Sequence, residues 1–205
     1  MKTIRTIIIA ALGALAACSP ATTELEDYTG YVNVRIGSGG HGHVFVGASV
    51  PFGAVQLGPT SIPQQWDWCS GYHSSDSTVI GFSHTHLSGT GIGDLFDITL
   101  MPVVGAVRYS RGEEPKDSTP EAIAAAQATG MWSYADRTRE VARPGYYSVP
   151  LTRYGISAEM TATTRVGLSR YTFPASDSSA VVIDLENGGK KKKKNDTKFT
   201  VVDSC

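Results

Sequence analysis

The sequence predicts an all-β protein, an antiparallel β-sandwich with Gly-rich loops. Charged residues make up only 18% of the chain, while glycine accounts for 22 of its 205 residues, a balance that favours a turn-rich β protein. Toward the C-terminal end, four apolar stretches of strand length are separated by turn residues. One of them, residues 156–161, alternates apolar and polar side chains, which is the period of a strand with one buried face.

The first 18 residues are predicted to be a lipoprotein signal peptide. Lys2 and Arg5 form a positive end, the apolar residues 6–15 are too few for a comfortable membrane span, and small residues lead to Cys18. Small residues before a cysteine are typical of the bacterial lipobox, so we expect Cys18 to become the lipid-modified first residue of the mature protein. An ordinary signal peptide cut nearby is the alternative.

Residues 19–30 are polar and acidic and predict a tether, which leaves residues 31–205 for one domain with a sizeable core. The net charge of −1 does not suggest a nucleic-acid partner. With Cys18 lipidated, Cys69 and Cys205 are the remaining thiols. They could pair in an oxidising compartment, but one bridge is not a disulfide framework.

The first candidate ligand-binding segment is the run Gly37-Ser38-Gly39-Gly40-His41-Gly42-His43. A phosphate-binding loop would need a helix after it, whose N-terminus faces the phosphate. The sequence continues instead with Val44-Phe45-Val46 and Gly47, a pattern typical of a strand and a turn. We therefore expect a loop that brings its backbone and two imidazoles close to a ligand, and not a nucleotide site.

The second candidate segment, residues 66–94, combines two tryptophans with a cysteine, three histidines and small polar residues. Trp66 and Trp68 flank Asp67, and in an extended segment both indoles would share one face. Half-exposed aromatic rings beside carboxylates and imidazoles are suited to carbohydrate, because the apolar face of a sugar stacks while its hydroxyls form hydrogen bonds. Two core aromatic residues are the alternative.

The five histidines, which lie between positions 41 and 86, raise the question of a metal. Two His-X-His steps could place pairs of imidazoles on one face of a strand, as a zinc site requires. No nearby Asp-X-His or Cys-X-X-Cys step completes a ligand set, so we assign no metal ligand to this chain. Imidazoles that bind sugar hydroxyls or hold loops in place are favoured.

Beyond Met101, residues 105–140 are expected to form an inserted loop with one short helix at 120–128, capped by Ser118 or Thr119. Strands are predicted at 146–151, 156–164, 166–173 and 180–185. The run Lys190–Lys194 must stay solvated because like charges repel. Another apolar strand begins after it, within residues 198–205.

Several sequence blocks, taken in order, resemble the N-terminal domain of glycoside hydrolase family 92, the bacterial exo-α-mannosidases. The blocks are GSGGHGH, PFGAVQLGP, WDWCSGYH, GFSHTHLSGTGIGD and LMP, and the resemblance extends over about residues 31–184. It implies a β-sandwich that is followed in the family by an (α/α)6 catalytic barrel. It also implies an inverting, calcium-dependent reaction on mannose-containing glycans, with α-1,2 linkages expected. In such a Gram-negative enzyme, the lipid would anchor the exported chain at the outer membrane, on its periplasmic or cell-surface face.

The resemblance also implies roles for particular residues. Trp66, Asp67, Trp68 and Cys69 correspond to the block that reaches the leaving-group side of the substrate, and His84 and His86 to pocket or loop-fixing residues. The acid and base carboxylates and most calcium ligands belong to the barrel, so no catalytic residue is assigned here. Asp94 and Asp97 are expected to cap turns.

Two functions follow as expectations. The chain is the substrate-contacting part of a mannosidase, truncated before the barrel and inactive without it, or it is a stand-alone lipid-anchored carbohydrate-binding module.

Overall fold

The computed structural model describes residues 26–63, 65–93, 95–185 and 200. The chain divides into an N-terminal unit that ends at Gly30 and a second unit that begins at Tyr31. No helix among the described residues is long and apolar enough to cross a bilayer. The predicted signal peptide with Cys18, the Lys190–Lys194 run and Cys205 all lie outside the described residues.

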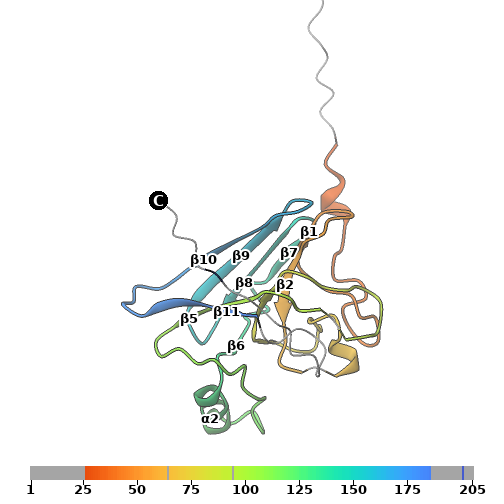
Figure 1. Cartoon of the computed structure of the whole chain (residues 1–205). Helices are drawn as coiled ribbons and strands as arrows, with labels where there is room; N and C mark the ends of the chain where they lie inside the picture. Colours follow the sequence, from red (N-terminus) through yellow and green to blue (C-terminus); the bar gives the residue numbers. More distant parts are fainter. Residues whose placement is uncertain (1–25, 64, 94, 186–199, 201–205) are drawn as a thin grey trace, which may run out of the picture. The chain divides into compact units, whose positions relative to one another are not determined.

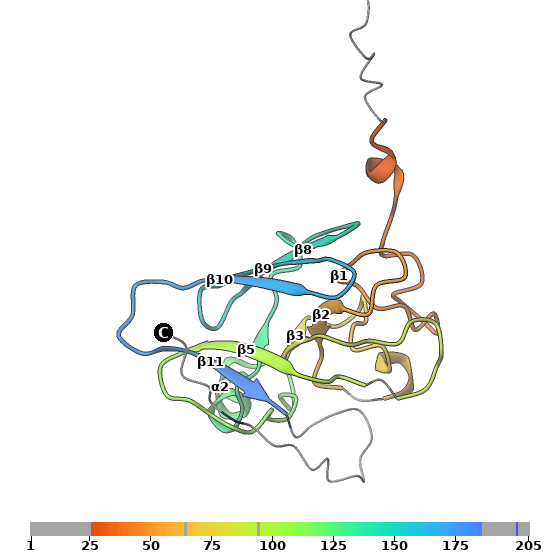
Figure 2. The ribbon, with the colours of Figure 1, turned by 45° about the horizontal axis from the view of Figure 1, so that its top comes forward.

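Two antiparallel sheets form the second unit, which confirms the all-β, sandwich-like fold. One sheet has the strand order β1-β2-β4-β5-β11, the other has the order β10-β9-β8-β7, and β3 pairs with β6 in a small third sheet (Figure 1). Figure 2 shows β8, β9 and β10 in one layer and β5 and β11 in the other. The elements are η2 (Tyr28–Tyr31), β1 (Ala48–Ser49), β2 (Gln56–Thr60), η3 (Trp66–Trp68), β3 (Thr78–Val79), β4 (Gly81–Ser83), β5 (Thr99–Val104), α2 (Pro120–Thr129), β6 (Ser133–Tyr134), β7 (Val141–Arg143), β8 (Tyr146–Leu151), β9 (Ile156–Ala162), β10 (Gly167–Thr172) and β11 (Ser179–Asp184).

The hairpin of β8 and β9 shows why the sequence forms strands here. Buried and partly exposed residues alternate along both strands, and the register places Val149 opposite Ala158 and Tyr147 opposite Met160. Because neighbouring side chains of a strand point to opposite faces, this alternation buries one face of the hairpin. The strand predicted from the alternation at 156–161 is therefore confirmed.

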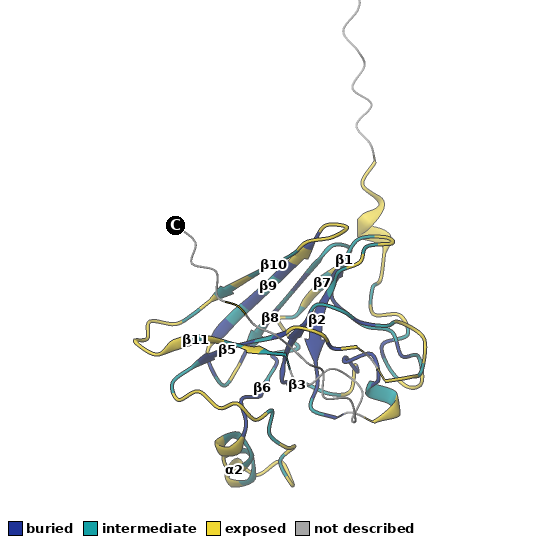
Figure 3. Cartoon of the chain, in the orientation of Figure 1, coloured by how far each residue is buried: buried dark blue, intermediate teal, exposed yellow. Residues whose placement is uncertain are grey.

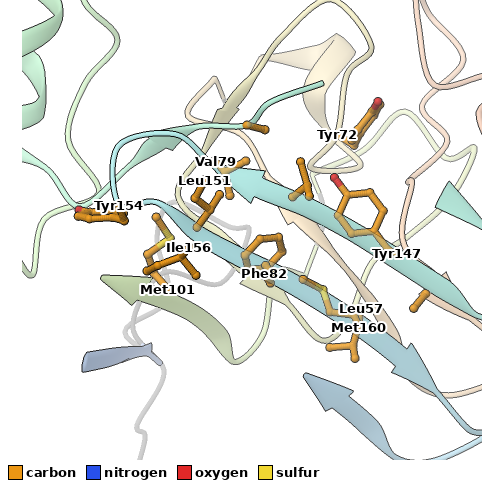
Figure 4. Close-up of a cluster of buried hydrophobic side chains, with 14 of the residues drawn as sticks. Leu57, Tyr72, Val79, Phe82, Met101, Tyr147, Leu151, Tyr154, Ile156 and Met160 are labelled. Atoms are coloured by element: carbon orange, nitrogen blue, oxygen red, sulfur yellow. The ribbon is translucent and has the colours of Figure 1, made fainter. Parts of the chain in front are cut away.

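The core lies between the two sheets. Leu57 and Phe82 come from the five-stranded sheet, Ile156 and Met160 come from β9, and all four are buried completely or almost completely. Figure 4 shows these side chains packed together, and Figure 3 shows buried residues along β2, β8 and β9 and exposed residues in many of the connecting loops. Burying a side chain of this size stabilises the fold by about 1.5–3 kcal/mol.

Two local predictions are wrong. Residues 44–46 are not a strand, because the Gly-rich segment folds back on itself and Val44 N donates to Gly37 O at 3.1 Å. Trp66–Trp68 is a 3-10 turn and not an extended segment, since Cys69 N donates to Trp66 O at 3.2 Å. In such a turn the two indoles point in different directions.

The predicted helix is confirmed as α2, and Thr119 is its N-cap, with Oγ1 accepting from Ala122 N at 3.3 Å. The stretch expected to be an inserted loop also contributes the short strand β6.

Candidate functional site

The Gly-rich loop (residues 37–43) and the WDW turn (residues 66–68) come together around one carboxylate. His41 Nδ1 lies 2.6 Å from Asp67 Oδ1, a hydrogen bond between residues 26 positions apart. His43 Nε2 lies 3.9 Å from the same oxygen, too far for a hydrogen bond. The structure thus brings both imidazoles of the Gly-rich loop to Asp67.

Trp66 is held in place at its edge while much of its surface stays open. Its indole Nε1 donates to Gly91 O at 2.8 Å, and its ring centroid lies 5.0 Å from that of His41 and 4.4 Å from that of His43. The residue is nevertheless 57% exposed. An ordered aromatic ring with open surface is the feature on which an apolar sugar face can stack.

His43 has two energetically unfavourable features, a positive backbone φ and a buried polar atom without a hydrogen-bond partner. Its backbone φ is +56°, in the left-handed region that non-glycine residues seldom adopt. Its side chain is only 6% exposed, and Nε2 is a buried atom without a hydrogen-bond partner. Because strained backbone and unpaired buried polar atoms cluster at functional sites, we regard His43 as part of a ligand-binding surface that sequence analysis placed only loosely.

Trp68 has a supporting position. Its Nε1 donates to Asp76 Oδ2 at 3.1 Å, and its ring packs on His73 with 4.5 Å between the centroids. His73 in turn donates from Nε2 to Gly40 O at 3.3 Å. Trp68 therefore braces the WDW turn against the Gly-rich loop, while Trp66 offers the open ring.

The other predicted site residues lie behind this surface or away from it. His84 Nδ1 donates to Ile98 O at 2.7 Å and so holds the loop before β5. His86 is buried, and its Nδ1 donates to Ser70 O at 3.1 Å while its ring stacks on Phe45. Cys69 is buried. The two histidines fix loops, and neither joins the His41–Asp67 pair.

A buried ionic cluster behind the WDW turn was missed by sequence analysis. The Glu140 carboxylate accepts hydrogen bonds from Arg35, Arg137, Tyr72 and Tyr147. Burial by itself would raise the pKa of Glu140, but the charge of Arg137 and hydrogen bonds from Tyr147 and Arg35 outweigh it and lower that pKa. These partners are up to 105 positions apart, so no local motif signals the cluster.

The described residues do not fit a calcium ion. Across 26–63, 65–93 and 95–185, no group of three or more His, Cys, Asp or Glu side chains is placed to hold a metal. Calcium takes six to eight oxygen ligands, whereas the neighbours of Asp67 here are imidazoles and an indole. No chemistry is therefore assigned to a metal on this chain.

A shallow cleft of about 200 Å³ lies elsewhere in the second unit and shares no lining residue with the Trp66 surface. It is lined by Val34, Val44, Phe45, Gly47, Ser49, Ser88, Pro144 and Gly145. None of these side chains carries a charge, so the cleft offers little to recognise a polar ligand.

Comparison with known proteins identifies the family that the chain resembles. The family model described as glycosyl hydrolase family 92 N-terminal domain matches residues 31–205. A family GH92 α-mannosidase from Bacteroides thetaiotaomicron, solved in complex with mannoimidazole, superposes with a TM-score of 0.72 at 38% identity, covering 80% of this chain and 20% of that one. A second GH92 family glycosyl hydrolase gives a TM-score of 0.64 at 28% identity, with 80% and 21% covered.

A curated relative from Arthroderma benhamiae, described as an uncharacterized secreted glycosidase, is 29% identical over 181 residues, which cover 85% of this chain and 22% of the relative. The chain thus spans about a fifth of the length of the proteins it matches.

Proposed function

Because the chain belongs to the glycosyl hydrolase family 92 N-terminal domains, we propose that it is the substrate-contacting domain of an exo-α-mannosidase acting on mannose-containing glycans. The observation that carries the proposal is the surface of Trp66, Asp67, His41 and His43, where an open indole is fixed beside a carboxylate and two imidazoles. The likeness to a solved α-mannosidase supports mannose as the sugar.

Within this surface, each group has a task that its contacts permit. The open ring of Trp66 stacks on the apolar face of a sugar, and Asp67 accepts hydrogen bonds from sugar hydroxyls. His43, whose buried Nε2 lies 3.9 Å from Asp67 Oδ1, packs its ring edge-on against Trp66 and supports the indole from within the fold. Trp68, Cys69, His84 and His86 hold these groups in place from behind or from neighbouring loops.

We place the catalytic carboxylates outside this chain. Inverting hydrolysis needs two carboxyl groups about 6.5–9.5 Å apart, one to protonate the leaving group and one to activate water. The described carboxylates near the surface have binding and supporting contacts, since Asp67 bonds His41 and Asp76 accepts from Trp68 and Thr78. An (α/α)6 barrel in the rest of the enzyme supplies acid, base and calcium in this proposal, with inversion and α-1,2 specificity as further parts of it.

The location is part of the same proposal. The residues before Cys18 match a lipobox, and the fungal relative is described as a secreted glycosidase. We therefore propose an exported chain, with a lipid on Cys18 that anchors it to the outer membrane.

The test is calorimetric titration of the chain, prepared without its predicted signal peptide, with α-mannobiose in the presence and absence of calcium. Trp66→Ala should abolish binding, while Tyr109→Ala, which removes another exposed aromatic residue far along the sequence, should not change it. Binding by this chain that Trp66→Ala abolishes supports the assigned surface, and activity of the full-length enzyme then distinguishes a mannosidase domain from a stand-alone carbohydrate-binding module. If only the full-length enzyme acts on the sugar, Trp66→Ala should raise its KM, and an unchanged KM would contradict the assigned surface.

A further inference from the structure

We propose that Glu140 is the positioning residue of this surface and that its buried carboxylate sets the spacing between the Gly-rich loop and the WDW turn. The inference rests on the proposed function for its meaning. Its geometry comes from residues outside the surface, because the hydrogen bonds of the Glu140 carboxylate within the described part of the chain go to Arg35, Tyr72, Arg137 and Tyr147.

The Glu140 carboxylate is buried and accepts hydrogen bonds from several parts of the chain. The Glu140 side chain is only 3% exposed. It accepts from Arg35 Nη2 at 3.1 Å, from Tyr72 OH at 3.1 Å, from Tyr147 OH at 2.5 Å and from Arg137 Nη1. A carboxylate can accept several hydrogen bonds at once, so one buried group joins four segments of the chain.

Two of these donors, Arg35 and Tyr72, lie next to the two segments that form the Trp66 surface. Arg35 stands just before the Gly-rich loop, and its carbonyl accepts from Ser38 N at 3.1 Å and Ser38 Oγ at 2.8 Å. Tyr72 stands just after the WDW turn, where Gly71 N donates to Trp68 O at 2.9 Å. We call the Gly-rich loop and the WDW turn, each with its flanking residues, the two arms of the surface. Glu140 therefore holds one end of each arm.

A second connection runs through Arg137. Its guanidinium lies 4.3 Å from the centre of the Tyr72 ring and donates to Asp76 O from Nε at 3.2 Å and from Nη2 at 2.8 Å. The Asp76 carboxylate accepts from Trp68 Nε1. Movement of Glu140 would therefore reach Trp68 by two routes.

Tyr147 provides the internal control. It is a β8 residue within the apolar core (Figure 4). Its hydroxyl binds the same carboxylate, and the residue lies in neither the Gly-rich loop nor the WDW turn. Loss of this hydroxyl weakens the anchoring of Glu140 to the sandwich but leaves Arg35 and Tyr72 bonded. A purely structural role for the cluster predicts similar effects for Tyr147→Phe and Glu140→Gln, whereas a positioning role predicts different ones.

The experiment compares Glu140→Gln, Arg35→Gln and Tyr147→Phe by two readouts, affinity for α-mannobiose and amide hydrogen exchange. Glu140→Gln should weaken binding by about 10- to 100-fold, since small misplacements of positioned groups have effects of that size. It should speed exchange at residues 37–43 and 66–73 alike. Arg35→Gln, at a position whose side chain is 40% exposed, should speed exchange at 37–43 alone. Tyr147→Phe should lower Tm but leave affinity within about twofold, since it spares both arms.

Equal losses of affinity in Glu140→Gln and Tyr147→Phe, or unchanged exchange in both arms of Glu140→Gln, would overturn the proposal. If Glu140→Gln does not fold, Arg35→Gln decides the outcome by the exchange of its single arm. If neither the wild-type chain nor the full-length enzyme binds α-mannobiose, the proposed function is wrong. The hydrogen-exchange measurements still decide whether Glu140 positions the two arms.

Discussion

The sandwich core and the Trp66 surface are stabilised in opposite ways. In the core, regular strands bury alternate apolar side chains such as Ile156 and Met160 between two sheets. At the surface, irregular backbone with positive φ at Gly37, His43 and Gly91 is held by hydrogen bonds, ring contacts and the Glu140 cluster. Stability and ligand recognition therefore depend on different contacts, and substitutions should separate them.

The largest effect is expected in the core. Phe82 is completely buried between the sheets, so Phe82→Ala should lower the free energy of unfolding by about 3–5 kcal/mol through lost burial and a cavity. The measurement is urea denaturation followed by circular dichroism. Leu168→Ala is the control, because Leu168 on the edge strand β10 is 65% exposed; it should change the free energy by less than about 0.5 kcal/mol. A comparable loss in both variants would contradict the division between core and surface.

An intermediate effect with a pH signature is expected for Glu140. Breaking a buried ion pair costs about 3–5 kcal/mol, and we expect Glu140→Gln to be near the lower figure at pH 7. The folded pKa of Glu140 lies below its ordinary value, because Arg137, Tyr147 and Arg35 outweigh the effect of burial. Its stabilising contribution is therefore complete above the unfolded pKa of about 4.3 and is lost as the pH falls through the folded pKa.

The corresponding measurement is urea denaturation of wild type and Glu140→Gln at several pH values between 7 and 3. The difference in unfolding free energy should stay constant down to about pH 4.3 and then shrink. A difference that persists unchanged at pH 3 would show that the charge of Glu140 does not hold the cluster together.

The smallest change in stability, but a clear one in binding, is expected at Gly91. Its φ is +63°, and an added Cβ would lie 3.1 Å from His43 Nδ1 and 3.3 Å from Trp66 Nε1. Gly91→Ala should therefore cost about 1–2 kcal/mol in backbone strain and displace both rings, so that mannobiose affinity falls. Gly89→Ala is the matched control, because Gly89 also has a positive φ, +77°, but open space around its Cβ position. If Gly91→Ala binds the sugar as well as Gly89→Ala does, the rings at Gly91 do not form the site.

Much of the sandwich could be predicted because its strands are local patterns. The alternation along β9, the turn residues between the C-terminal strands and the Thr119 cap of α2 each express a preference of neighbouring residues. Prediction failed at residues 44–46 and at Trp66–Trp68, where apolar or aromatic residues resemble strand segments but backbone bonds to Gly37 O and Trp66 O bend the chain. A one-dimensional pattern does not contain such bends.

The sequence by itself determined the fold class, the strands of the C-terminal part and the blocks that identify the family. Only the tertiary structure decided that His41 and His43 meet at Asp67, that Trp66 rather than Trp68 keeps an open ring, and that Arg35 and Glu140 join across 105 positions. Strand periodicity can be read from the sequence, because successive residues of a strand point to opposite faces and only one face is buried. Contacts between distant loops depend on where the folded sheets place their ends, which no local spacing records.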